Sequence, residues 1–237
     1  MTSPPATHEP LSRTARATRT RILEAARREL GRNADSSLGD IAKAAGVARR
    51  TVYAHFAGRA ALVGGLAADA GEAIRVAITV IDASAASRGP APDAASALAR
   101  VVLTLWPVGD RYRTLIGLAR QDLGANGFSG LLAPVRDTVA GILARGQRQG
   151  VFRTGVPPGP LSRALEAHIL ALLDSVNSGI WADDGTGAAT TTLIAAGADR
   201  DVAASTVRRL RDANQPGCNA QLPGCQIARV PSNSGAK

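Results

Sequence analysis

The chain has 237 residues, of which 45% are hydrophobic and 20% charged, and its formal net charge is +9. This length and hydrophobic share predict a globular protein with a substantial core and exclude a disordered chain. No stretch approaches the roughly 18 uncharged apolar residues of a membrane span, and residues 1–20 lack the apolar core of a signal peptide, so we expect a cytoplasmic protein with no membrane partner.

The positive charge is concentrated near the N-terminus. Residues 1–60 hold eleven basic and five acidic side chains, a net charge of +6, which leaves +3 for the other 177 residues. Such a local excess points to a polyanionic partner more strongly than the total charge does. Residues 1–17 contain three prolines and no periodicity, so we expect a flexible basic arm that either follows DNA or is a solvated tail.

The next segment predicts two helices separated by a short break. Apolar residues at three- and four-residue steps predict a first helix at about 18–32, with Ile22, Leu23, Ala26 and Leu30 on one face. Ser37 followed by Asp40 matches the capping box that starts a helix. Gly46 ends that second helix, because a left-handed cap is least costly for a residue without Cβ.

A third helix, at about 48–55, has a testable geometry. If Val52 points to the core, Phe56 lies on the same face one turn later, whereas Arg50 and Ala54 face away. An arginine and a small alanine therefore point at whatever this helix meets. Two short helices joined at a glycine, with arginines opening the second, have the layout of a helix-turn-helix DNA reader.

The pattern changes beyond Gly58 to six long helical runs. We expect them at about 60–84, 93–106, 110–123, 131–149, 161–181 and 186–213. Pro107 is expected to end the second run, glycines at 124–127 to form a turn, and Gly197 to weaken the last run. No alternating strand pattern persists, so the sequence predicts an all-α fold.

The C-terminal segment, 214–237, repeats Pro-Gly-Cys at Cys218 and at Cys225 and is otherwise rich in turn-forming residues. We expect a disordered tail. Two cysteines seven residues apart without a nearby histidine fall short of a zinc site, so no metal is expected there.

Several motifs in the correct order resemble the DNA-binding domain of TetR-family transcriptional regulators. They are residues 22–26 (Ile-Leu-Glu-Ala-Ala), 40–47 (Asp-Ile-Ala-Lys-Ala-Ala-Gly-Val) and 51–56 (Thr-Val-Tyr-Ala-His-Phe), followed by Arg59, Ala61 and Leu62. The resemblance implies a three-helix DNA-binding domain at 18–62, with its helix-turn-helix at 37–56, and a larger helical domain for ligand binding and dimerisation at 63–213. Residues 131–152 are loosely similar to a helix and turn of the family's regulatory domain.

Three residues depart from the family pattern. Ala48 replaces the usual hydroxyl cap of the recognition helix, a loss of roughly 1 kcal/mol unless another group caps it. Leu30 stands where an aromatic residue is common. Ala54 stands where many members carry a larger polar residue, so base reading is expected to depend more on the neighbouring arginines.

The resemblance and the helix geometry together assign the DNA contacts. We expect Arg50 and Thr51 to meet base edges, Arg49 a base or a phosphate, and the others phosphates. The alternative interpretations are a solvated face for the arginines, a core position for His55 and a helix cap alone for Ser37. The full set is Ser37, Arg49, Arg50, Thr51, Tyr53, His55 and Arg59.

The last two long helices carry apolar stripes that fit either a dimer interface, as the resemblance implies, or the core of one chain. Their residues are Leu161, Leu165, Ile169, Leu172, Leu173 and Val176, then Leu193, Val202, Val207 and Leu210. A ligand pocket would draw on the scarce large or polar groups of the aliphatic helices, unless these are core residues. The candidates are Trp106, Tyr112, Phe128, His168 and Trp181, around an apolar or amphipathic effector.

These features predict a homodimeric transcriptional regulator, more readily a repressor than an activator, that a small-molecule effector releases from a palindromic DNA operator. One alternative is an architectural DNA-binding protein without effector control. The other is an enzyme, which the inventory disfavours: three dispersed histidines, no Gly-rich phosphate loop and no clustered carboxylates. No cofactor is expected.

Overall fold

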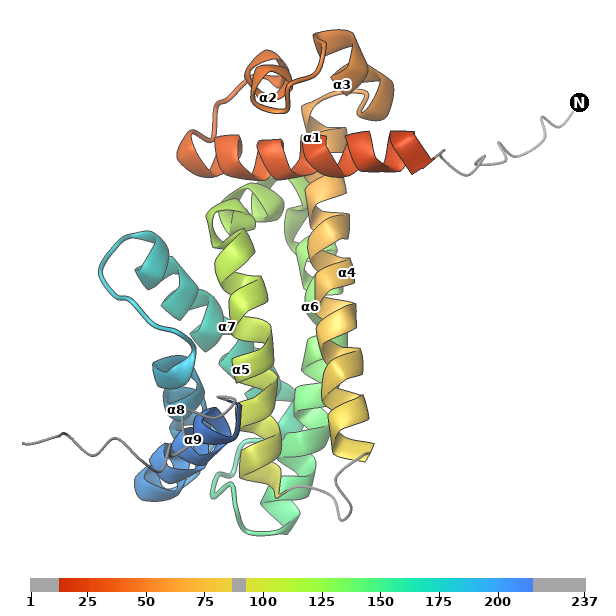
Figure 1. The fold of residues 1–237 in the computed structure, drawn as a ribbon. Helices are drawn as coiled ribbons and strands as arrows, with labels where there is room; N and C mark the ends of the chain where they lie inside the picture. The colour runs from red at the N-terminus through yellow and green to blue at the C-terminus, as the bar shows by residue number, and fades with distance from the viewer. Residues whose placement is uncertain (1–12, 87–92, 215–237) are drawn as a thin grey trace, which may run out of the picture.

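The computed structural model describes residues 13–86 and 93–214, and these ranges are helical without any strand (Figure 1). In chain order the elements are α1 (Arg13–Arg32), α2 (Leu38–Ala44), α3 (Arg49–His55), α4 (Arg59–Ala86), α5 (Ala94–Tyr112), the 3-10 turn η1 (Arg113–Leu115), α6 (Ile116–Arg148), α7 (Pro158–Asn177), α8 (Thr186–Ala195) and α9 (Arg200–Asn214). Within the same ranges no helix has the length and hydropathy needed to cross a bilayer. The predicted all-α class is confirmed.

The first three helices form one end of the molecule. α1 lies across the end of the helical bundle, α2 and α3 sit beyond it, and α4 runs from this end down into the bundle (Figure 1). The predicted capping box is present, since the Ser37 hydroxyl accepts from the Asp40 amide at 3.2 Å and the Asp40 carboxylate accepts from the Ser37 amide at 2.9 Å. The carboxylate's hydrogen bonds from Ser37 lower the pKa of Asp40.

α5 is the central helix of the bundle and packs against α4, α6, α8 and α9. Its first half is largely buried, since eight of the nine residues from Ala94 to Val102 are buried, and four of these eight are alanine. The apolar stripes of the C-terminal helices also face this core: Leu161, Leu165, Leu173, Leu193, Val207 and Leu210 are buried. These six residues therefore belong to the core of one chain rather than to a dimer interface. Among the ten residues of the two stripes, only Val202 is well exposed.

Two predicted helix boundaries were wrong. α1 begins at Arg13, so residues 13–17 are helical rather than part of an arm, and residues 1–12 lie outside the described ranges. α5 does not stop at Pro107 but continues to Tyr112. A proline inside a helix costs about 3 kcal/mol, and the burial of Trp106 and Tyr112 on either side of it favours the unbroken helix.

Glycines break the remaining helices where their freedom at positive φ is needed. Gly124 (φ +67°, ψ 173°) kinks α6, so the predicted glycine turn is a single break inside a helix that continues to Arg148. The predicted run at 186–213 is two helices that meet near Gly197 (φ +96°). The predicted tail lies outside the described residues, apart from Asn214.

Replacing Gly197 by Ala should lower the free energy of unfolding by about 2–4 kcal/mol, because the position combines positive φ with a crowded Cβ. A Cβ there would lie 2.9 Å from the backbone nitrogen and oxygen of Arg153, whose amide donates to the Gly197 carbonyl. Urea unfolding measures the loss. Gly159→Ala, where a Cβ meets nothing within 4 Å, is the matched control and should change stability by less than about 1 kcal/mol. Equal effects of the two substitutions would contradict this account.

Candidate DNA-binding surface and ligand cavity

The orientation of α3 agrees with the geometry expected from the sequence. Val52 and Phe56 are 0% and 3% exposed and belong to the core beneath the helix, whereas Arg50 and Ala54 are exposed. Ala48 precedes the helix without any side-chain cap, and its carbonyl instead accepts from the amide of Thr51 at 2.8 Å. The outward face therefore presents arginine and alanine from a helix whose other face is fixed in the core.

The two arginines of α3 differ in their surroundings. The Arg49 guanidinium lies 5.7 Å from the centre of the Tyr53 ring and within 3.5 Å of its hydroxyl. Within the described part of the chain, the Arg50 side chain makes neither a hydrogen bond nor an ion pair. Its guanidinium thus keeps all of its donors for another molecule.

Other predicted contact residues lie around α3. Tyr53 is 46% exposed, while Thr51 and His55 are half-buried. Arg59, at the start of α4, donates to the carbonyls of Ala34 and of Ser36, the latter at 3.1 Å. These hydrogen bonds between α4 and the loop before α2 were not predicted from the sequence. A phosphate contact from Arg59 stays a prediction.

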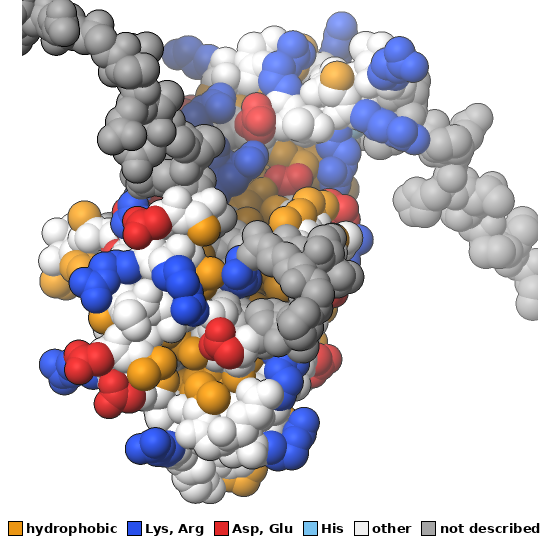
Figure 2. Space-filling model, turned by 60° about the horizontal axis from the view of Figure 1, so that its bottom comes forward, with side chains coloured by type: hydrophobic (Ala, Val, Ile, Leu, Met, Phe, Trp, Pro, Cys, Tyr) orange, Lys and Arg blue, Asp and Glu red, His pale blue; other side chains and the backbone are white. Residues whose placement is uncertain are grey.

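The basic side chains gather at the end of the molecule formed by α1–α3. Figure 2 shows Lys and Arg crowding that end, whereas basic and acidic side chains alternate over the part of the bundle in view. Exposed arginines of α1 contribute to the crowding, among them Arg16, Arg21 and Arg28. A surface of this kind attracts a phosphate backbone without reading its sequence.

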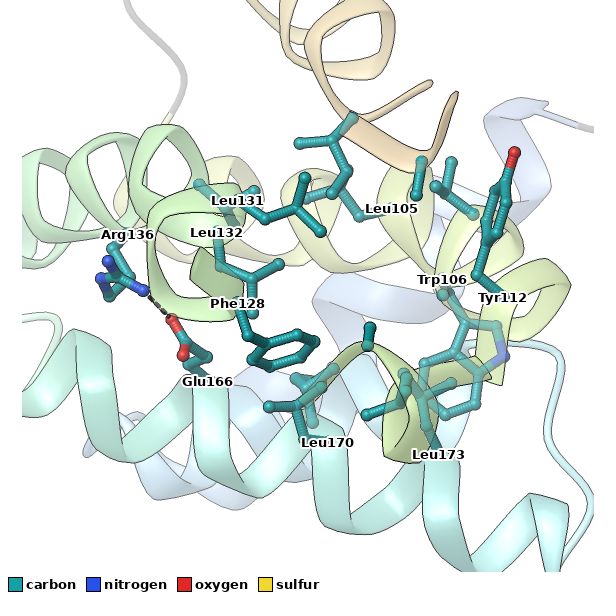
Figure 3. A pocket seen from close by; sticks show the side chains of 18 of the residues that line it. Leu105, Trp106, Tyr112, Phe128, Leu131, Leu132, Arg136, Glu166, Leu170 and Leu173 are labelled. Carbon is teal, nitrogen blue, oxygen red and sulfur yellow. Dashed lines mark hydrogen bonds and ion pairs between the residues drawn. The ribbon is translucent and has the colours of Figure 1, made fainter. Parts of the chain in front are cut away.

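A cavity of about 190 Å³ lies within the bundle between α4, α5, α6 and α7. Leu, Val, Ile and Ala make up most of its wall, including Leu105, Leu132 and Leu170 (Figure 3). Such a wall suits an apolar body, and the few polar groups in it would fix its orientation.

Three of the five predicted pocket residues line this cavity: Trp106, Tyr112 and Phe128. His168 and Trp181 do not. The Trp181 ring packs edge-on against Trp106 with centres 6.1 Å apart, and Trp106 Nε1 donates to a backbone carbonyl. His168 lies 3.1 Å from the Thr191 hydroxyl, and partial burial lowers the pKa of its ring.

Two charged residues that were not predicted from the sequence also line the cavity, Arg136 of α6 and Glu166 of α7. Arg136 Nη1 donates to Glu166 Oε2 at 2.7 Å, and Nη2 donates to the Ser129 carbonyl at 2.7 Å. Their side chains are only 12% and 24% exposed. The signal was available, because Arg136 falls four residues after Leu132 and Glu166 three before Ile169, each on the apolar stripe of its helix.

Tyr112 connects the cavity to the end of the molecule formed by α1–α3. Its ring lines the cavity, and together with Leu115 it also belongs to the apolar core formed by α1–α4. The Tyr112 hydroxyl donates to Asp69 Oδ2 at 2.5 Å, and burial and this carboxylate raise the pKa of Tyr112 to about 12. One side chain thus borders both the cavity and the apolar core beneath α1.

Tyr112→Phe should lower the free energy of unfolding by about 1–2 kcal/mol at neutral pH, because the hydrogen bond to a carboxylate is lost. Since the folded pKa of Tyr112 is raised, its contribution is complete below the usual tyrosine pKa near 10 and disappears between about pH 10 and 12. Urea unfolding at pH 8 and pH 11 measures the difference between wild type and variant. A difference that stays the same or grows at pH 11 would refute the assigned role of the hydroxyl.

Comparison with known proteins agrees with this arrangement. The profile described as "Bacterial regulatory proteins, tetR family" matches residues 22–66, which run from the middle of α1 through α2 and α3 to the first turns of α4. In these residues the chain matches the tetR family. No curated protein matches it.

Solved structures share the TetR-family fold over most of this chain. The TetR-like transcriptional regulator LfrR from Mycobacterium smegmatis, in complex with proflavine, is 23% identical, with a TM-score of 0.60 over 77% of this chain and 96% of LfrR. FadR from Bacillus subtilis, in complex with stearoyl-CoA, is 19% identical, with a TM-score of 0.59 over 75% and 97%. A tetR-family protein from Rhodococcus RHA1 is 17% identical, with a TM-score of 0.60 over 80% and 100%. At these identities the similarity establishes the fold.

Proposed function

We propose that this chain is a TetR-family regulator, a homodimeric repressor that binds a palindromic operator through α3 and leaves it when a small molecule occupies the bundle cavity. The observation that carries the proposal is the shared position of Tyr112, whose ring borders the cavity and also packs in the core beneath α1. A ligand that displaces this ring would change the packing of the core on which the DNA-binding domain rests.

In the proposed complex, Arg50 and Thr51 face base edges in the major groove. Arginine can bind O6 and N7 of guanine with two hydrogen bonds, and the unpaired guanidinium of Arg50 suits that role. Arg49, Tyr53 and His55 contact the phosphates that flank the read bases. Ser37, at the N-terminus of α2, and Arg59 contact further phosphates. These contacts position the protein along the DNA without reading its sequence.

The proposed dimer forms through the outer faces of α7 and α8. α7 corresponds to the fifth long helix predicted from the sequence, and α8 to the first part of the sixth. These faces carry small or apolar exposed residues: Ala164, Ala171, Ile194 and Ala195. The contact between His168 and Thr191 joins the two helices into one surface. Small side chains allow close helix approach, and a twofold pair would place two α3 helices on successive major grooves.

Effector control is favoured over an architectural role because the bundle is not fully packed. An architectural protein would have no need of a largely apolar cavity of about 190 Å³ beside its DNA-binding domain. LfrR and FadR hold proflavine and stearoyl-CoA in their solved structures. We therefore expect an apolar or amphipathic effector in this cavity.

A gel-shift titration on the promoter region of the chain's own gene tests the proposal. We expect a discrete complex that forms at lower protein concentration than any complex with a scrambled duplex of the same length, in the same salt. Equal affinity for the two duplexes would refute operator recognition. A specific complex that no compound from a screen can weaken would favour the architectural alternative.

A further inference from the structure

The cavity wall holds one pair of opposite charges among apolar side chains. Arg136 and Glu166 lie side by side near Phe128 and Leu132, while Trp106 and Tyr112 lie at the opposite side (Figure 3). Every other charged side chain in the described ranges lies outside this wall. An elongated ligand in this cavity would therefore meet charged partners at one end only.

The pair offers both a donor and an acceptor to a ligand. Glu166 Oε2 is used by Arg136, while Oε1 receives no hydrogen bond from the described residues. Arg136 uses one hydrogen of Nη1 and one of Nη2, and a guanidinium carries five. A bound group can thus donate to Glu166 and accept from Arg136 without breaking their bond.

The pair also disfavours a charged ligand group, because it is already neutral as a unit. An ammonium group on Glu166 would lie next to the guanidinium, and a carboxylate on Arg136 would lie next to the Glu166 carboxylate. Either arrangement brings like charges together in a weakly solvated wall, or separates the two partners and leaves one of them unpaired.

We propose that the cavity selects an uncharged amphiphile, with an aliphatic body toward Trp106 and Tyr112 and a hydroxyl or similar group, both donor and acceptor, on Arg136 and Glu166. This inference rests on the proposed function only in taking the cavity as the effector site. It adds the chemical class of the effector and the residues that recognise its polar end.

The test measures direct binding of eight-carbon probes to the full-length protein. Calorimetry or tryptophan fluorescence detects the binding. The probes are 1-octanol, octyl methyl ether, octanoate and octylammonium at neutral pH. We expect 1-octanol to bind at least about tenfold more tightly than either charged probe, and octyl methyl ether to bind several-fold more weakly because it cannot donate.

Two variants should reverse the charge preference. Glu166→Gln leaves Arg136 unpaired and should make octanoate the best ligand, whereas Arg136→Gln leaves Glu166 unpaired and should favour octylammonium. Arg75→Gln, which removes an exposed ion pair on α4, is the matched control and should keep the wild-type order. If the single variants unfold, the double variant Arg136→Gln/Glu166→Gln should retain a preference for 1-octanol.

Tighter binding of octanoate or octylammonium to the wild type would overturn the inference, as would the failure of all four probes to bind. The operator is absent from these measurements, so the outcome is independent of the proposed repressor role. If 1-octanol binds preferentially here but leaves operator affinity unchanged in a separate DNA-binding assay, this inference stands and effector control is refuted.

Discussion

Arg50→Ala should weaken operator binding by about 30-fold or more, because a bidentate arginine–guanine contact is worth about 1–3 kcal/mol and the proposed dimer would make it in both half-sites. Fluorescence anisotropy with the operator and with a scrambled duplex measures the loss. Affinity for the scrambled duplex should fall much less, so that the specificity ratio falls with the operator affinity. Arg50 is exposed and unpaired in the described ranges, so the fold should be unaffected.

Two further arginine variants serve as controls. Arg49→Ala should weaken binding to both duplexes and reduce the salt dependence if Arg49 contacts a phosphate. Arg75→Ala, on α4 within an exposed pair with Glu72, should change neither. An operator affinity of Arg50→Ala equal to that of wild type would mean that α3 does not read bases through this residue.

Ala171→Glu should convert the dimer to a monomer and lower operator affinity by about 100-fold or more, because a monomer reads one half-site and forfeits the linked second contact. Ala171 lies exposed on α7, in the middle of the proposed interface. A carboxylate there is solvated in the monomer but would be buried without a partner in the dimer. Light scattering after size exclusion measures the mass, and anisotropy the operator affinity.

Ala68→Glu is the matched control, since Ala68 is exposed on a different helix, α4, and the added charge is the same. It should remain dimeric with wild-type operator affinity. A dimeric Ala171→Glu protein would place the interface elsewhere, for example around Val76 and Val80, which are 54% and 53% exposed on α4.

Much of the DNA-binding domain could be predicted because its signals are local. The capping box at Ser37 and the helical phase of Val52 and Phe56 depend on residues within one or two turns, and both appear in the structure as predicted. The engagement of Arg59 with the carbonyls of Ala34 and Ser36 depends on how α4 meets the preceding loop. No pattern around Arg59 indicates that contact.

The cavity was harder to predict because it depends on which helices face one another. Trp106 and Trp181 are equally scarce large residues, yet only Trp106 reaches the cavity, and Trp181 packs behind it. Pro107 was a misleading local signal, since tertiary packing outweighs its cost and carries α5 on to Tyr112. Arg136 and Glu166 were predictable in principle, as charges on apolar stripes, but their pairing requires the packing of α6 on α7.

The proposed coupling between cavity and operator is tested most directly by operator affinity with the cavity occupied. A suitable ligand is a compound that raises the melting temperature of the wild type but not of Leu132→Trp, whose indole would fill the cavity. At saturation it should lower operator affinity at least about tenfold, and operator DNA should weaken its binding by the same factor. Unchanged operator affinity with the cavity saturated would contradict effector control.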